Sequence, residues 1–279
     1  MIQVITDTTS TLTLTECKEL GIELFPQIIV FEEKEYRDDY EISAEQFLDK
    51  LRTSPTLPHT AAPSPALYNP IYEKVLSKGD TALVLCPSAK VSGTFRSASI
   101  AAKDFPTDNI HIIDTEIIGP AFGFVVQEAD MMAKNGKGID EITSWIKSKC
   151  KKLIIYFYVD TLEYLQKGGR IGLAKALVGS VLQIKPILQF KDGQVNPFEN
   201  QRTKKRAIAR IIDLVKTGCS ISVENNLSIF HAAAMEDALY LKSELQALSP
   251  TNEIKITNLP PAIVVHAGPG VVAVSFFAN

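Results

Sequence analysis

Short apolar runs alternate with amphipathic stretches through the first half of the chain. The runs have the length and polar boundaries of buried strands, and the stretches have the apolar period of helices. The predicted strands lie in IQVITDTTS at the start, then in TALVLCPSAK and in IHIIDTE, and the first two end in polar turns. The predicted helices cover about residues 15–20, 97–105, 121–135 and 139–149, and the first is expected to stop at Gly21. This alternation predicts an N-terminal three-layer α/β domain with a parallel sheet, spanning residues 1–152.

A second domain is predicted for residues 153–279. It begins with a strand in KKLIIYFYVD, and the Asp192-Gly193 pair between two apolar runs is a strong hairpin signal. A basic helix follows, then a strand with an amphipathic helix, and then the strand EIKITNL. These elements predict a C-terminal α/β domain with a mixed sheet.

The segment 262–278 is almost wholly apolar and close to the length of a membrane-spanning helix. His266 and the Gly-Pro-Gly sequence at 268–270 interrupt it. A spanning helix would be broken there and would place an ionisable ring in hydrocarbon. Two short buried strands joined by a turn fit the pattern better. We therefore expect no stable membrane insertion.

Charge and cysteine usage narrow the classes of function. The chain has 29 Lys and Arg against 32 Asp and Glu, so its overall charge does not favour nucleic acid or an anionic membrane as a partner. Its four cysteines are scattered singly, without the spacing of a zinc site or a dithiol motif. We expect no metal and no cofactor. The start, MIQVITDTTS, has no secretory signal pattern, which predicts a cytoplasmic location.

Two hydroxyl-rich segments are candidates for binding an anion. Thr60 lies in HTAAPSP, which is either a capped loop before a helix or a turn that presents the Thr60 hydroxyl to a ligand. The turn PSAKVSGT follows a predicted strand and precedes a helix, where free backbone N–H groups favour anions. Ser92, Gly93 and Thr94 belong to this turn, and the two hydroxyls could equally be helix caps. The turn lacks the glycine spacing of a nucleotide-binding loop.

Arg170 and His266 are further candidates. Arg170 follows paired glycines in KGGRIG, a composition that allows close backbone approach while the guanidinium binds a carboxylate or phosphate. The same composition is found in ordinary turns. His266 lies in an apolar segment, where a histidine is either a satisfied core residue or a functional group.

A basic cluster stands out in an otherwise slightly acidic chain. It comprises Arg202, Lys204, Lys205, Arg206 and Arg210. The cluster is either a solvated helix face or a docking surface for an acidic partner.

Taken together, these segments resemble the DegV family, which includes the fatty-acid-binding subunits of bacterial fatty acid kinase. The resemblance spans the whole chain. It rests on Asp7-Thr8-Thr9, Thr60 with Pro63-Ser64, Ser92-Gly93-Thr94, the run from Val159 to Leu165 leading into Gly168-Gly169-Arg170-Ile171, Lys185-Pro186-Ile187, Arg202, and His266 before Gly268-Pro269-Gly270. One departure is Ala61-Ala62, where the family usually has Ser-Gln, so two polar side chains near the ligand are missing.

The resemblance implies two α/β domains that hold one long-chain fatty acid in an apolar tunnel. It implies that residues matching Thr60 and Ser92 hold the carboxylate, that Gly93 and Thr94 belong to the same site, and that Arg170 and His266 lie close by. Family members of this kind perform no chemistry themselves. They present the carboxylate to a separate ATP-dependent kinase, which forms an acyl phosphate for phospholipid synthesis. Arg202, Lys204, Lys205 and Arg206 are then the expected docking surface for that kinase.

Two alternatives remain open at this point. The family's fold looks similar to the substrate-binding part of dihydroxyacetone kinases, in which a histidine holds a small ketone covalently, and His266 would then be the nucleophile. A lipid-responsive regulator would bind the same acids for sensing rather than for metabolism.

Overall fold

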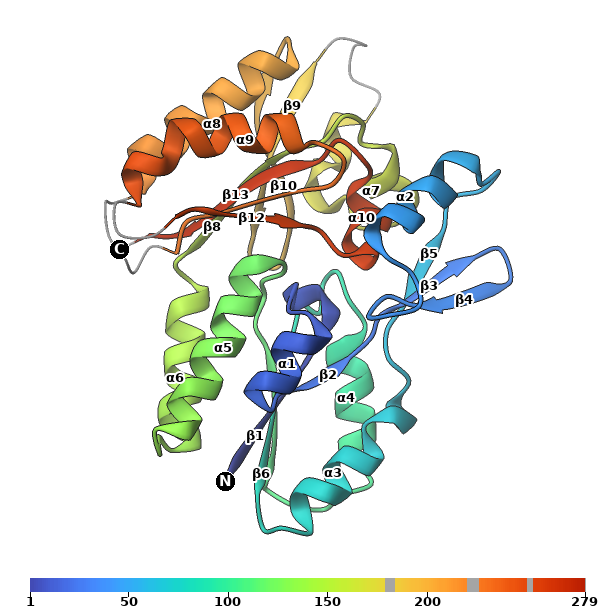
Figure 1. Cartoon of the computed structure of the whole chain (residues 1–279), viewed down its shortest axis with the longest axis vertical. Helices are drawn as coiled ribbons and strands as arrows, with labels where there is room; N and C mark the ends of the chain where they lie inside the picture. Colours follow the sequence, from blue (N-terminus) through green and yellow to red (C-terminus); the bar gives the residue numbers. More distant parts are fainter. Residues whose placement is uncertain (179–183, 220–225, 250–252, 279) are drawn as a thin grey trace.

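The first half of the chain forms a parallel sheet between two layers of helices (Figure 1). The computed structural model describes residues 1–178, 184–219, 226–249 and 253–278. The sheet has the order β2-β1-β6-β7, and every neighbouring pair is parallel. Its strands are β1 (Ile2–Asp7), β2 (Glu23–Phe25), β6 (Thr81–Cys86) and β7 (Ile110–Asp114). The predicted parallel α/β fold is confirmed.

Helices cover both faces of this sheet. One face packs against α1 (Leu14–Leu20), α5 (Pro120–Lys134) and α6 (Ile139–Cys150), and the other against α3 (Asn69–Leu76) and α4 (Thr94–Ala102). Local sequence sets the ends of α1. Thr13 and Glu16 form a capping box at its start, and Gly21, with φ of 71°, ends it as expected.

The second half forms a mixed sheet of six strands in the order β10-β9-β8-β13-β11-β12. Only the β11–β12 pair is parallel. The strands are β8 (Leu153–Tyr158), β9 (Lys185–Lys191), β10 (Gln194–Gln201), β11 (Ser228–His231), β12 (Lys255–Asn258) and β13 (Val272–Phe277). Asp192 and Gly193 join β9 to β10 with positive φ angles of 51° and 75°, as a tight hairpin turn requires. The predicted hairpin and mixed sheet are therefore present.

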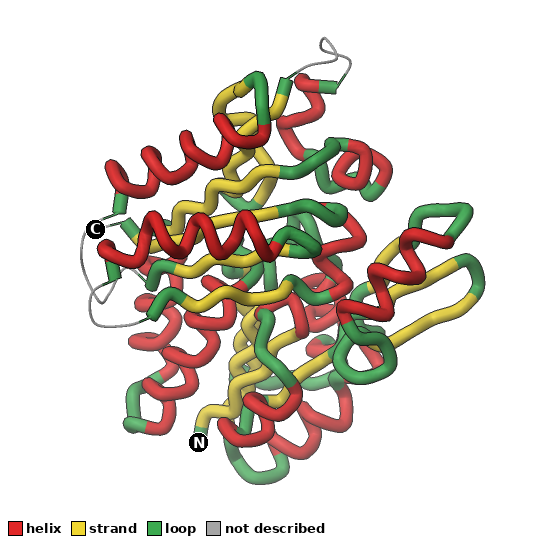
Figure 2. The backbone as a smooth tube through the Cα atoms, turned by 45° about the horizontal axis from the view of Figure 1, so that its top comes forward, coloured by secondary structure: helices red, strands yellow, loops and turns green. Residues whose placement is uncertain are grey.

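Two layers of helix also enclose the mixed sheet. The long helices α8 (Lys204–Gly218) and α9 (Met235–Leu245) cover one face, as Figure 2 shows. Shorter helices pack on the opposite apolar face. These are α2 (Ala44–Thr53), α7 (Glu163–Lys167), α10 (Pro261–Ala267) and the 3-10 turn η3 (Gly172–Leu177). That second face is the one turned toward the N-terminal half and the cavity described below.

The C-terminal apolar segment does not form two strands as expected. Its first part is the helix α10, and only its second part, β13, is a strand. Pro261 stands in the first turn of α10, where its fixed φ and missing N–H are tolerated, and Gly268, with φ of 78°, ends it. The β-branched run Ile-Val-Val concealed this helix because a short apolar run has no distinctive period. Among the described residues, no helix is both long and apolar enough to cross a bilayer.

A small antiparallel sheet beside the first one was not predicted. It consists of β3 (Ile28–Phe31) between β4 (Lys34–Arg37) and β5 (His59–Ala61). Thr60 therefore lies on an edge strand, opposite Ile29, rather than in a turn. Edge strands this short and polar lack the alternating pattern that identifies a strand in sequence.

The strands of the parallel sheet lie within residues 2–114 and those of the mixed sheet within 153–277. The hairpin turn of β9 and β10 connects the two halves. Ser88 Oγ donates to the carbonyl of Gly193 (2.6 Å), and Lys90 Nζ donates to that of Asp192 (2.6 Å). A domain boundary at residue 152 stays a prediction.

Candidate functional site

A cavity lies where the carboxyl ends of the parallel strands face the mixed sheet. Counted with the open solvent at its mouth, it measures about 800 Å³. Most of its lining is apolar and comes from β8, β9, β11, β13 and α10. Its polar lining residues are Thr9, Gln27, Thr60, Ser92, Arg170 and His266. The cavity therefore suits a ligand that is mainly apolar and has a small polar group.

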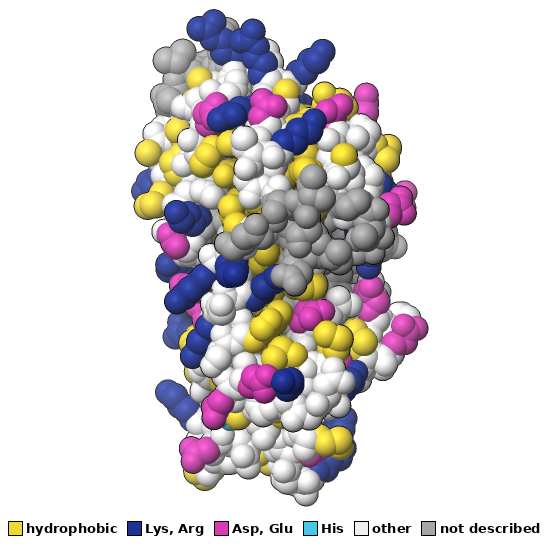
Figure 3. Space-filling model, turned by 90° about the vertical axis from the view of Figure 1, so that its left-hand side faces the viewer, with side chains coloured by type: hydrophobic (Ala, Val, Ile, Leu, Met, Phe, Trp, Pro, Cys, Tyr) yellow, Lys and Arg dark blue, Asp and Glu magenta, His cyan; other side chains and the backbone are white. Residues whose placement is uncertain are grey.

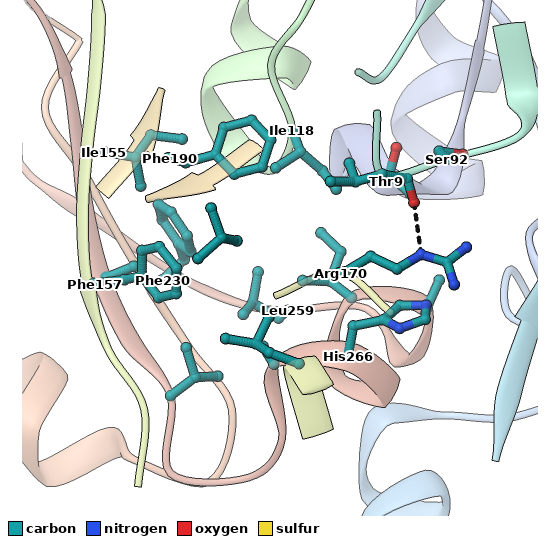
Figure 4. A pocket seen from close by; sticks show the side chains of 18 of the residues that line it. Thr9, Ser92, Ile118, Ile155, Phe157, Arg170, Phe190, Phe230, Leu259 and His266 are labelled. Carbon is teal, nitrogen blue, oxygen red and sulfur yellow. Dashed lines mark hydrogen bonds between the residues drawn. The ribbon is translucent and has the colours of Figure 1, made fainter. Parts of the chain in front are cut away.

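The polar side chains gather toward one end of the cavity. In Figure 4, Thr9, Ser92, Arg170 and His266 lie together, and Phe157, Phe190 and Phe230 lie on the opposite side. We call the first group, with Thr60 and Gln27, the polar end. Six separate segments supply these residues, so only the folded chain brings them together.

Thr60 and His266 form a direct pair across the polar end. Thr60 Oγ1 and His266 Nε2 are 2.8 Å apart, although 206 residues separate them in sequence. Burial, with a further contribution from Arg170, lowers the pKa of His266 to about 3, so its ring is neutral at physiological pH. Gly168 leaves room for the ring, because a Cβ there would lie 2.4 Å from His266 Nδ1.

Arg170 supplies a cation beside this pair. Its Nε donates to the carbonyl of Val91 (3.0 Å, the dashed line in Figure 4), and its Nη1 donates to that of Gly168 (2.7 Å). Burial lowers the pKa of Arg170, yet a guanidinium titrates so high that it remains charged at neutral pH. Its remaining N–H groups have no hydrogen-bond partner among the described residues. These free N–H groups of the guanidinium could donate hydrogen bonds to a carboxylate.

The turn after β6 contributes Val91 and Ser92 to the cavity but not the two residues that follow. Ser92 Oγ lies 3.1 Å from Thr94 Oγ1 and accepts a bond from the Thr94 N–H (3.3 Å). Thr94 is only 1% exposed and begins α4, and a Cβ added at Gly93 would lie 3.2 Å from Ala62 Cβ. Neither Gly93 nor Thr94 lines the cavity. Their contact with a ligand stays a prediction.

A buried hydrogen-bond network behind the polar end was missed in the sequence. Asp7 Oδ2 accepts from Gln27 Nε2 (2.6 Å) and from Thr94 Oγ1 (2.5 Å), and Asp7 Oδ1 accepts from both the N–H and the hydroxyl of Thr9. Asp7 is fully buried, and this burial raises its pKa against the effect of those bonds. Because Thr9 and Gln27 line the cavity, the hydrogen bonds to Asp7 hold two of its polar side chains in place. The strand-end turn that contains Asp7 was recognised, but its partner Gln27 carried no sequence signal.

Asp38 extends this network on the side away from the cavity. Asp38 Oδ1 accepts from the hydroxyl of Thr8 (2.7 Å) and from the Gln27 N–H (2.9 Å), whereas buried Oδ2 has no partner among the described residues. Burial, opposed by the Thr8 bond and reinforced by the charge of Asp7, raises the pKa of Asp38 to about 7.

Stability is therefore expected to fall as the pH rises from about 4 to about 7, because the folded protein holds a proton on Asp38 that the unfolded chain has released. The free energy of unfolding should decrease by up to about 4 kcal/mol over that window, at ~1.4 kcal/mol per unit of pKa difference. Asp38→Asn keeps the acceptor for Thr8 and Gln27 and carries no charge, so it should flatten this dependence. Urea unfolding at several pH values measures both proteins, and equal slopes would contradict the assignment.

The basic cluster lies at the start of α8 and is only partly free. Lys204 pairs with Asp237 (2.7 Å), and Arg210 pairs with Glu199 (3.0 Å). Arg202, Lys205 and Arg206 are exposed and take part in none of the ion pairs found among the described residues. No three His, Cys, Asp or Glu side chains in those residues are placed to hold a metal ion.

Comparison with known proteins gives the chain a family. The model of a family described as uncharacterised proteins of the DegV family matches residues 1–279. The chain belongs to the DegV family. Protein DegV of Bacillus subtilis is 33% identical to it over 276 residues, which cover 98% of each chain. The resemblance seen in the sequence motifs is thus confirmed.

Solved structures of other DegV proteins share the fold over nearly their whole length. DegV of Bacillus subtilis, a fatty acid binding protein, superposes with a TM-score of 0.88 at 32% identity, covering 100% of this chain and 99% of that one. Fatty-acid-binding DegV family proteins of Thermus thermophilus and Streptococcus agalactiae each superpose with a TM-score of 0.90 at 28% identity and the same coverage. The cavity of this DegV protein therefore belongs to a fold in which relatives bind fatty acids.

Proposed function

We propose that this protein binds one long-chain fatty acid, with the acyl chain among the apolar walls and the carboxylate at the polar end. The observation that carries the proposal is the division of a single cavity into a long apolar part and one end where Arg170, Ser92 and the Thr60–His266 pair converge. Fatty acid binding by relatives at 28–32% identity supports it.

The apolar part of the cavity supplies most of the expected affinity. An acyl chain of about fourteen methylenes, at ~0.8 kcal/mol each, contributes on the order of 11 kcal/mol before the entropy cost of binding. Hydrogen bonds to the charged carboxylate add about 1.5–3 kcal/mol each in gross terms. The polar end therefore serves mainly to orient the acid. Arg170, Thr60 and Ser92 are the residues to which we assign carboxylate binding, with His266 as the partner that positions Thr60.

The apolar lining favours a fatty acid over the small ketone of the alternative reading. A small polyhydroxylated ketone could be held at the polar end alone and would leave the apolar walls around Phe157 and Phe230 unused. His266 is moreover hydrogen-bonded through Nε2 to Thr60. The lipid-responsive regulator would use the same cavity and differs from the carrier only in its partner.

Native mass spectrometry of the freshly purified protein, followed by organic extraction, tests the proposed ligand. We expect the intact mass to exceed that of the chain by one fatty acid, and the extract to contain that acid. A protein that is purified empty and then takes up no fatty acid would contradict the proposal.

We further propose that the bound acid is presented to a separate ATP-dependent kinase and that this chain performs no chemistry. The chain lacks the glycine spacing of a nucleotide-binding loop, so the phosphoryl donor must be held by a partner. The docking surface that we assign consists of Arg202, Lys205 and Arg206. Lys204 lies beside these residues, but its charge is already paired with Asp237.

Arg202→Ala is expected to weaken kinase binding by about tenfold or more while leaving fatty acid affinity unchanged, because an exposed charge contributes to partner recognition and not to the cavity. Lys216→Ala is the matched control. Lys216 lies near the end of α8, the helix that begins two residues after Arg202, and pairs with Glu244. Pull-down of the kinase and a fatty acid titration measure the two properties separately. Loss of lipid with retained kinase binding in Arg202→Ala would reverse the assignment.

A further inference from the structure

At the end opposite the polar end, the cavity is separated from a second hollow by a single layer of side chains. This hollow measures about 1,270 Å³ including open solvent and lies between the end of β7, α6 and the β8–β9 strands. Consecutive residues divide between the two spaces. Ile117 lines the second hollow and Ile118 the cavity, and Ile154 and Ile155 divide in the same way. Phe190 lines both.

The two spaces differ sharply in polarity. The wall of the second hollow includes Lys147, Lys151, Lys152 and Lys191 together with Asp114 and Glu116. Figure 3, drawn toward the side of α5 and α6, shows Lys and Arg side chains gathered midway along the molecule. An acyl chain that entered this hollow would pass from an apolar environment into a charged and hydrated one. Methylenes in the hollow would stay in contact with water, so they would add no favourable free energy of burial.

The Phe190 ring stands between these environments. It is 8% exposed, pairs across the strands with Ile155, and belongs to the apolar cluster around the cavity. In Figure 4 the ring lies beside Ile118, on the side of the cavity away from Arg170 and His266. The adjacent hairpin turn is held by the hydrogen bonds from Ser88 and Lys90 to residues 193 and 192, so β9 is fixed close to the point where the ring closes the wall.

We propose that Phe190 sets the longest acyl chain that the protein accepts, by closing the cavity against the lysine-lined hollow. This inference rests on the proposed fatty acid binding and adds the residue that limits it. Acids that fit between the polar end and Phe190 bind with their terminal methyl against the ring. Longer acids are rejected because the ring blocks the continuation into the hollow.

Phe190→Ala opens that continuation, and Phe230→Ala is its matched control. Phe230 is an equally large ring that lines the cavity and is 7% exposed, but it does not border the second hollow. Both variants enlarge the cavity, and only the first joins it to the hollow. Because loss of a buried ring destabilises a core, Phe190→Leu provides a milder second variant at the same position.

The test is competition binding of saturated acids from lauric to lignoceric acid to delipidated protein, read by native mass spectrometry. For acids that exceed the wild-type limit by two or more carbons, Phe190→Ala should bind about tenfold more tightly than wild type. The space left by the ring buries about two more methylenes, which account for roughly that factor, and any further carbons extend into the hollow without a clash. Phe190→Leu should shift in the same direction by less. Phe230→Ala should extend the limit by no more than one two-carbon step.

The reactivity of a terminal alkyne shows where the end of the bound acyl chain lies. A long acid with a terminal alkyne should resist copper-catalysed coupling in wild type and Phe230→Ala, and should react in Phe190→Ala, where its end reaches the hydrated hollow. If wild type binds fatty acids and the folded Phe190 variants keep the same length limit, or shift no more than Phe230→Ala, the inference is overturned and the proposed function stands. If wild type binds no fatty acid, the proposed function itself has failed.

Discussion

Arg170→Ala is expected to weaken fatty acid binding by about 100-fold or more. Truncation of one member of a desolvated, hydrogen-bonded charge pair costs about 2–5 kcal/mol, because the other charge is left buried without its partner. Arg170 is half-buried, its Nε and Nη1 are fixed by the carbonyls of Val91 and Gly168, and it is the one cationic side chain that lines the cavity among the described residues. Titration of delipidated protein with palmitate measures the loss.

Three controls isolate the carboxylate contact. Arg170→Lys keeps the charge but not the planar fork, so its affinity should lie between those of wild type and Arg170→Ala. Arg210→Ala removes an arginine that pairs with Glu199 outside the cavity and should leave affinity unchanged. The methyl ester of palmitate should bind wild type and Arg170→Ala within about twofold of each other, because it carries no charge for the guanidinium to meet. Equal losses for acid and ester would mean that Arg170 acts on the fold and not on the carboxylate.

Asp7→Ala is expected to lower the free energy of unfolding by about 3–5 kcal/mol, a large part of the 5–15 kcal/mol that stabilises a typical domain. The change removes the acceptor for Thr9, Gln27 and Thr94 at once and leaves their donors buried. Each unsatisfied buried donor costs about 1–3 kcal/mol. Chemical denaturation measures the loss, and fatty acid affinity should fall as well because Thr9 and Gln27 line the cavity.

Asp7→Asn is the matched control for this network. The asparagine oxygen can keep both bonds from Thr9, and its amide nitrogen can donate to Gln27 once the Gln27 amide turns over. Thr94 can then donate to the turned Gln27 oxygen, which its present 2.9 Å separation from Gln27 Nε2 allows. The asparagine also avoids the cost of burying a charge. Asp7→Asn should therefore cost less than about 1.5 kcal/mol, and a loss equal to that of Asp7→Ala would show that the negative charge itself is required.

Sequence patterns were sufficient for the parts of the fold whose signals are local. The stop at Gly21 and the Asp192-Gly193 turn each depend on a few adjacent residues, and both were predicted. The capping box at Thr13 is equally local but was missed. Helix α10 was not predicted, because a short apolar run fits a strand as well as a buried helix. The strand β5 was missed because its pairing with β3 exists only in the folded chain.

Some residues of the candidate site could likewise be predicted from local sequence, and others could not. Thr60, Ser92, Arg170 and His266 were singled out because each lies in a segment of unusual composition, and the structure brings all four to one cavity. Gln27 was missed because a glutamine before an ordinary strand has no local feature that distinguishes it. Phe190 was missed because period-2 alternation shows that a strand residue is buried but not that a cavity lies in front of it.

A crystal structure with a long-chain fatty acid brominated at its terminal carbon tests the central claim most directly, because anomalous scattering locates the bromine independently of the protein. We predict one bromine peak per chain among Phe157, Phe190 and Phe230, with the carboxylate hydrogen-bonded to Arg170 and Ser92. A bromine beside His266, or outside the cavity altogether, would contradict the proposed mode of binding.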